Sequence, residues 1–169
     1  MKPTLTITRD LVTPELKRMA AQVSNKRPVL EAMGLALVSV TQRAFNDASL
    51  RPSAWAPKKT SDGRPLLKRS GLLWRSARIV ALDGNSVTVG TDRPYAGAHQ
   101  FGSRPHVIRA KNKRALFWPG ASHPVRQVNH PGLPARPFFP FDASGNMSPA
   151  AAARIRSAAM AKLQAMLRR

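Results

Sequence analysis

The chain has 169 residues, the size of one ordinary domain, so a single core with projections is expected over residues 1–169. It contains no cysteine, which excludes disulfides and thiolate metal sites, and it shows neither a signal peptide nor the roughly 18 apolar residues in a row that a membrane span needs. A formal charge of +20 predicts a negatively charged partner, and no acidic residue occurs between Arg93 and Phe141. The charge alone leaves open whether that partner is nucleic acid or an acidic protein surface.

The N-terminal third of the chain predicts a short strand followed by two helices. Residues 3–9 alternate apolar with polar side chains, as a strand does. Thr13 and Pro14 form a good helix start, and Pro28 restarts or kinks the helix. The second helix then carries one apolar stripe, formed by Leu30, Met33, Leu37, Val40 and Ala44. Because residues 34–38 are apolar all round, we place this helix in the middle of the fold.

The middle of the chain predicts a loop, a short helix and a β-hairpin. Residues 50–66 are rich in proline and lysine and are expected to form a basic, mobile loop. Ser70 is positioned to cap a short helix. Residues 77–82 and 86–90 are β-prone and flank Asp-Gly-Asn at 83–85, a turn expected to need positive φ.

Residues 105–133, called the arm from here on, predict a projecting β-hairpin. Two β-prone runs, His106–Ala110 and Ala115–Trp118, flank a basic tip at residues 111–114, and a third run covers residues 125–128. These runs indicate a hairpin over residues 105–118 with the basic tip at its turn.

The C-terminal part predicts an apolar segment and a helix. The segment contains Phe138, Phe139 and Phe141, and Ser148 followed by Pro149 begins a helix over residues 148–168. The order of elements indicates an α+β fold, with N-terminal helices, a small antiparallel sheet carrying the projecting β-hairpin arm, and a C-terminal helix.

Catalytic and metal sites are not expected. Eight scattered carboxylates offer few pairs for acid–base work, and no phosphate-binding glycine motif is present. The histidines lack metal-ligand spacing; they are His99, His106, His123 and His130. We therefore predict no enzyme activity, no cofactor and no bound metal.

Nucleic-acid binding is the alternative that the residues themselves favour. Basic and aromatic side chains interleave in residues 109–118, and a basic hairpin can follow a phosphate backbone. No zinc-finger spacing, ribonucleoprotein motif or helix-turn-helix accompanies them. The candidate contacts to DNA or to an acidic partner are Arg109, Lys111, Lys113 and Arg114.

Three segments in order carry a family resemblance. Residues 67–76, LKRSGLLWRS, fit L-x-x-S-G-x-L-x-x-S. Residues 87–90, VTVG, followed by residues 95–102, YAGAHQFG, fit V-x-V-G and Y-A-x-x-H-Q-x-G, and residues 134–139, PARPFF, fit P-A-R-P-F-[LF]. Together they resemble the Mu-like phage virion morphogenesis family, whose members are also described as tail-completion or neck proteins.

The resemblance implies a structural role in the virion, at the neck or the top of the tail. It implies completion of the tail or joining of the tail to the DNA-filled head, by a protein made in the bacterial cytoplasm without membrane contact. The implied partners are copies of the chain itself in a hexameric ring, adjacent neck, connector, tail-tube or tail-terminator proteins, and packaged DNA as a further contact.

Two sets of residues follow as candidates. Tyr95 and His99 are four apart and share one face of a helical turn, and Arg136 has a planar guanidinium suited to carboxylates or backbone carbonyls. The candidate interface residues are Trp55, Tyr95, His99, Gln100, Arg136 and Phe138. The residues expected to define the fold are Ser70, Gly71, Gly90, Gly102, Pro134 and Pro137.

Overall fold

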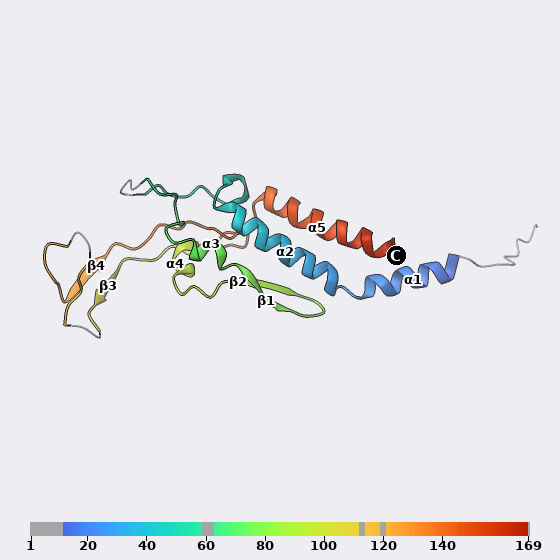
Figure 1. The fold of residues 1–169 in the computed structure, drawn as a ribbon, viewed down its shortest axis with the longest axis horizontal. Coiled ribbons are helices and arrows are strands. Elements are labelled where there is room, and N and C mark those ends of the chain that lie inside the picture. The colour runs from blue at the N-terminus through green and yellow to red at the C-terminus, as the bar shows by residue number, and fades with distance from the viewer. Residues whose placement is uncertain (1–11, 59–62, 112–113, 119–120, 169) are drawn as a thin grey trace, which may run out of the picture.

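The computed structural model describes residues 12–58, 63–111, 114–118 and 121–168, so the strand expected at residues 3–9 lies outside the described residues. The molecule is elongated, with helices toward one end and the arm at the other (Figure 1). The elements are α1 (Val12–Ser24), α2 (Arg27–Ala44), η1 (Ala48–Leu50), α3 (Leu72–Arg75), β1 (Arg78–Leu82), β2 (Val87–Gly90), α4 (Ala96–Phe101), β3 (His106–Arg109), β4 (Gln127–His130) and α5 (Pro149–Leu167). The predicted α+β class is confirmed, although the arm forms a two-stranded sheet of its own.

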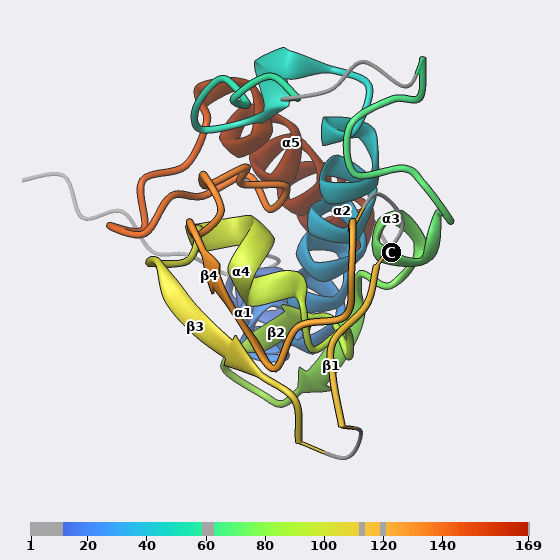
Figure 2. The ribbon, with the colours of Figure 1, turned by 90° about the vertical axis from the view of Figure 1, so that its left-hand side faces the viewer.

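Helix α2 lies between α5 on one side and the β1–β2 hairpin on the other, which confirms its predicted central position (Figures 1 and 2). The hairpin approaches α2 at Gly34, where an added Cβ would lie 2.6 Å from Val87 Cγ2 and 2.9 Å from Ile79 Cδ1. Glycine therefore sets the distance between helix and hairpin. The apolar residues 34–38 of α2 are not all buried, since Leu35 remains 59% exposed.

Helix α1 extends beyond the C-terminal end of α5 (Figure 1). Large apolar side chains of this helix lie at the surface, since Leu16 is 58% exposed and Val23 is 42% exposed. The main packing contacts of α1 run to α5. None of the helices in the described ranges has the length and apolar character of a membrane span.

The β1–β2 hairpin forms as predicted, with Arg78 opposite Gly90 and Leu82 opposite Val87. The expected need for positive φ in its turn is wrong, because Gly84 does not have a positive φ. The carboxylate of Asp83 holds the turn instead by accepting the Asn85 and Ser86 amides, each at 2.7 Å. A local side-chain bond of this kind replaces the left-handed backbone that the sequence suggested.

The arm projects as predicted, but its strands pair differently. Strand β3 pairs with β4, so His106 lies opposite His130, and not with residues 115–118. Beyond these strands an isolated bridge joins Leu116 to Val125. The predicted 105–118 hairpin is therefore wrong, because the partner strand of β3 is β4, which overlaps the third β-prone run (Figure 1).

The core gathers around the predicted phenylalanine segment. Phe138 is 1% exposed and Phe139 is 7% exposed, and they pack with Phe45, Leu73 and Ala96. A second cluster joins the end of α2 to the start of α5 through Val40, Ala44, Leu50 and Ala151. Ser148 begins α5 as predicted, because its hydroxyl accepts the Ala151 amide at 3.3 Å and donates to the Ser49 carbonyl at 2.7 Å.

We expect the Ser148→Ala substitution to lower the free energy of unfolding by about 1 to 2 kcal/mol, because it removes a helix cap and a bond to η1. Urea denaturation followed by circular dichroism measures this. Ser157→Ala is the matched control, since Ser157 is exposed within the same helix. Equal midpoints for the two variants would show that the cap does not stabilise α5.

Candidate functional site

Gln100 joins the second motif segment to the third. It lies on α4, is 4% exposed, and its side-chain amide donates to the Phe141 carbonyl at 2.7 Å. Its carbonyl oxygen accepts the amides of Phe138 at 3.0 Å and Phe139 at 2.9 Å. One buried side chain therefore satisfies three backbone groups of the segment 138–141, and the amides of Phe138 and Phe139 would otherwise be buried without an acceptor.

Arg136 joins the third segment to the loop that precedes the first. Its guanidinium donates to the Ala56 carbonyl at 2.8 Å and to the Pro57 carbonyl at 2.9 Å, so within the subunit it binds backbone carbonyls, one of the two kinds of acceptor expected of it. The indole of Trp55 donates in return to the Pro137 carbonyl at 2.7 Å, and the Arg51 guanidinium lies 3.7 Å from the Trp55 ring centroid. The described start of the 50–66 loop is thus tied to the core, and the mobility of the loop remains a prediction.

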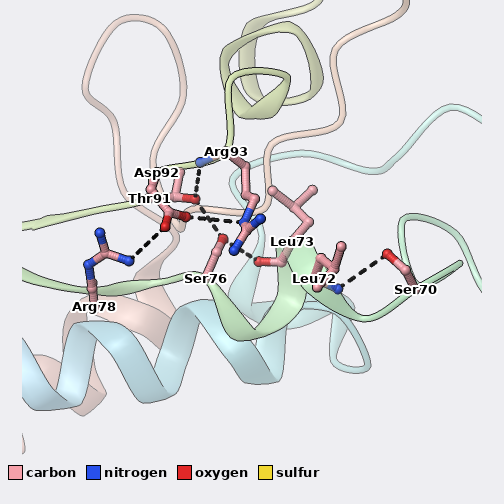
Figure 3. A network of polar contacts seen from close by, with 8 residues as sticks. All are labelled: Ser70, Leu72, Leu73, Ser76, Arg78, Thr91, Asp92 and Arg93. Carbon is pink, nitrogen blue, oxygen red and sulfur yellow. Dashed lines mark hydrogen bonds and ion pairs between the residues drawn. The ribbon is translucent and has the colours of Figure 1, made fainter.

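Ser76 joins the first motif to the second, as Figure 3 shows. Its hydroxyl donates to the Leu73 carbonyl at 2.7 Å and shares a hydrogen bond of 2.6 Å with the Thr91 hydroxyl. Beside it Asp92 forms ion pairs with Arg78 at 3.0 Å and Arg93 at 3.1 Å. The sequence pattern contained Ser76, but no role was predicted for it, because its partner is distant in the chain.

The residues expected to define the fold mostly have the structural roles predicted for them, and only Gly71 is required for a different reason. Ser70 accepts the Leu72 amide at 3.4 Å, as expected of a residue near the start of α3 (Figure 3). Gly71 is needed for its φ of 71° and not for close packing, since an added Cβ would be 3.9 Å from the nearest side chains. Gly102 ends α4 as predicted, and a Cβ there would lie 2.8 Å from the Leu133 carbonyl. Gly90 ends β2, Pro137 is buried and Pro134 is exposed.

Tyr95 and His99 lie together, as their spacing predicted. Their rings meet edge to face with centroids 5.9 Å apart, and both line a pocket of about 330 Å³ with Ser70 and Leu73. Burial, and then the positive charge of Arg136, lower the pKa of His99 below its usual 6.5. His99 therefore contributes a neutral imidazole at neutral pH.

The interface candidates separate into two groups. Gln100 and Phe138 are buried and contact their own chain, and Trp55 and Arg136 make the intramolecular bonds given above. Tyr95 is 40% exposed and, with the half-buried His99, keeps surface that a neighbour can contact. The interface role of all six residues remains a prediction.

The arm carries the largest accessible set of candidate residues. Arg109, Lys111 and Arg114 are exposed, while Lys113 lies outside the described residues. Apolar side chains are exposed beside them: Val107 by 49%, Ile108 by 37%, Phe117 by 68% and Trp118 by 43%. The sequence noted the aromatic residues of this region but did not select Phe117 or Trp118 as candidates, because their exposure follows from the arm's position away from the core.

The chain belongs to the phage virion morphogenesis family, whose family model matches residues 8–164. It is 31% identical over 94 residues to the protein named Mu-like prophage FluMu G protein 2 of Haemophilus influenzae. That match spans 55% of this chain and 64% of the relative, which is less than two thirds of the relative's length. No solved structure matches the chain. The resemblance expected from the three motifs is confirmed, and the chain is a phage protein with a structural or assembly role.

We expect the Gln100→Ala substitution to lower the free energy of unfolding by about 3 kcal/mol, because it leaves buried amides of Phe138 and Phe139 without acceptors. Chemical denaturation measures the change. Gln164→Ala on the exposed side of α5 is the matched control and should change stability by less than about 0.5 kcal/mol. A loss of similar size in both variants would contradict the role assigned to Gln100.

The lowered pKa of His99 predicts a pH dependence of stability. Because the folded state binds this proton less readily than the unfolded state, His99 favours folding fully above pH 6.5 and loses that contribution as the pH falls below it. Thermal melts between pH 7.5 and pH 5 should therefore vary less with pH in His99→Gln than in the wild type. His123→Gln, at an exposed position, should keep the wild-type dependence, and an unchanged slope in His99→Gln would contradict the assignment.

Proposed function

We propose that this protein is a structural subunit of the phage neck or tail end, where it completes the tail or joins it to the head within a ring of identical subunits. Membership of the phage virion morphogenesis family supports this role. The observation that carries the proposal is the arm, which projects from the core and exposes both apolar and basic side chains. Such a surface is typical of one that becomes covered on assembly.

The axial position of a neck or tail-end protein favours a closed ring, and six copies is the number that we propose. A heterologous contact, in which one surface of a subunit binds a different surface of the next, generates a ring when the rotation closes. The neighbours in this proposal are the adjacent neck, connector, tail-tube or tail-terminator proteins. Tyr95 and His99 are candidates for contacts to them, because they line an open pocket bordered by the basic side chains of Lys58, Arg64 and Arg69.

DNA contact is the second candidate function, and the acid-free arm is the observation that favours it. Its Lys and Arg residues are Arg109, Lys111, Lys113, Arg114 and Arg126. In the alternative based on DNA, these side chains neutralise phosphates and the exposed aromatic rings add stacking. The two functions differ in how binding responds to salt and to the loss of charge.

We expect the triple variant Lys111→Ala, Lys113→Ala, Arg114→Ala to fold normally, because exposed charges change stability by only about 0.5 kcal/mol. If the arm binds a virion protein, the variant should fail to restore infectious particles to a phage that lacks the gene. If the arm binds DNA, the variant should instead lose DNA affinity. The slope of log affinity against log salt concentration should then correspond to up to about three fewer phosphate contacts.

The matched control removes three exposed charges from the helical end of the molecule, in the variant Arg156→Ala, Lys162→Ala, Arg168→Ala. It carries the same net charge as the arm variant. A difference between the two variants therefore reports where the charges lie and not how many were removed. Normal infectious yield from the arm variant, or equal losses in both variants, would contradict a specific role for the arm's charge.

A further inference from the structure

A second pocket lies at the base of the arm and is lined mainly by apolar groups. Its volume is about 240 Å³. It is lined by Gly90, Thr91, Ala96, Gly97, Gln100, Phe101, Phe138, Phe139 and Phe141. Phe101, which is 55% exposed, directly precedes the residues where the arm begins, since Ser103 pairs with Leu133. We call this the base pocket. Its aromatic lining suits a flat apolar side chain.

The far end of the arm presents such side chains. Phe117 and Trp118 follow the Leu116–Val125 bridge and open the outer loop of the arm. Phe117 has the greatest exposure, 68%, among the large apolar side chains of the described residues. We call this pair the aromatic end. Leaving two large rings in water forgoes the free energy that their burial would supply, so a partner is expected to cover them.

The aromatic end lies among basic residues, whereas carboxylates lie beside the base pocket. The aromatic end belongs to an arm without acidic residues, and exposed Lys111 and Arg114 lie in the neighbouring loop. Asp92 and Asp142 each directly follow a residue that lines the base pocket. Asp92 is already paired with two arginines, but Asp142 contacts no cationic side chain within the described residues. Hydrogen bonds from Asn146 hold the pKa of Asp142 below its usual 3.8, so it remains charged at neutral pH.

We propose that the aromatic end of one subunit inserts into the base pocket of a second copy of this chain. The base pocket is lined by residues of α4, and Figure 1 shows α4 at the inner end of the arm, whereas the aromatic end lies beyond the Leu116–Val125 bridge, so one subunit cannot join the two with its own residues. A contact between different surfaces repeats from copy to copy in the same sense, which produces a ring when the rotation closes. The inference deepens the proposed function and rests on its ring of identical subunits, for which it names the contact.

This contact differs from DNA binding in its dependence on salt. Each subunit carries a formal charge of +20, so copies repel one another at low ionic strength. Salt screens that repulsion but weakens burial of aromatic rings very little, so the contact between copies should persist or strengthen as salt rises. Binding of the same arm to DNA should weaken steeply under those conditions.

Thiol exchange tests the contact directly, because the natural chain has no cysteine. Gly97→Cys places a thiol at the base pocket, where an added Cβ meets no atom within 4 Å. Ala121→Cys places one beside the aromatic end, since the Ala121 amide donates to the Trp118 carbonyl at 3.0 Å. The Gly97→Cys thiol is first converted to its thionitrobenzoate disulfide. The free Ala121→Cys thiolate then attacks that disulfide, forming a mixed disulfide between two chains and releasing thionitrobenzoate, which is measured by absorbance.

Gly84→Cys in the β1–β2 turn is the matched control, because its Cβ also meets no atom within 4 Å. We expect exchange with the Gly97→Cys chain to be about tenfold faster than with the Gly84→Cys chain, in low and in high salt. Adding Phe117→Ala and Trp118→Ala to the Ala121→Cys chain should remove the difference between the two exchange rates. Adding Asp142→Asn to the Gly97→Cys chain should reduce that difference. Circular dichroism confirms that these chains are folded.

Equal rates for the two acceptor chains at both salt concentrations would overturn the proposal, as would a preference that survives loss of both aromatic side chains. Capture of the aromatic end by single-stranded DNA, with no preference for the Gly97→Cys chain, would assign it to nucleic acid and overturn it as well. The measurement uses purified protein alone, so it is independent of the test in infected cells that decides the role in virion assembly.

Discussion

The fold depends on one buried amide. Gln100 holds an irregular segment of phenylalanines by three backbone hydrogen bonds, and without it the buried amides of Phe138 and Phe139 would have no acceptor. The same bonds fix α4 against Phe138 and so determine where the chain leaves the core after Gly102. The paired residues Ser103 and Leu133 then start the arm from a defined position. A side chain in the core thereby sets the direction of a structure that projects far from it.

Around Gln100, hydrogen bonds from side chains to the backbone take the place of a large regular sheet. The described chain contains only two two-stranded sheets, neither of which forms an extensive core alone. Arg136 and Trp55 exchange hydrogen bonds to each other's segments, and Ser76 with Thr91 adds a link at the first motif. Carbonyls and amides of these loop segments thus have specific partners, as those of strands do. The rigid core can in this way support an arm that makes few contacts of its own.

Charge and exposed apolar surface are distributed differently in the arm and in the rest of the molecule, which we call the body. Carboxylates of the body are largely engaged locally, as Asp83 is in its turn and Asp92 is with two arginines. The arm has no carboxylate, and every residue of its strand β3 is exposed. A protein that belongs to a virion morphogenesis family and has this division of surface is organised for contact with neighbours.

The sequence by itself determined the features that depend on neighbours in the chain. Ser148 and Pro149 fixed the start of α5, Pro28 fixed the start of α2, and the i, i+4 spacing brought Tyr95 to His99. Such elements follow from caps, proline geometry and helical periodicity, which act over a few residues. The three motifs likewise identified the family, since their order and spacing are legible without coordinates.

Only the tertiary structure decided which distant segments meet. The strand partner of residues 106–109 was predicted too close in the chain, because local β-propensity does not distinguish 115–118 from 127–130. The turn after β1 was predicted to need positive φ, but a bond from Asp83 supplies its geometry. The burial of Gln100 and the exposure of Phe117 were equally beyond the sequence. Both depend on where the chain folds back on itself, and the same residue types occupy the core in one place and the surface in another.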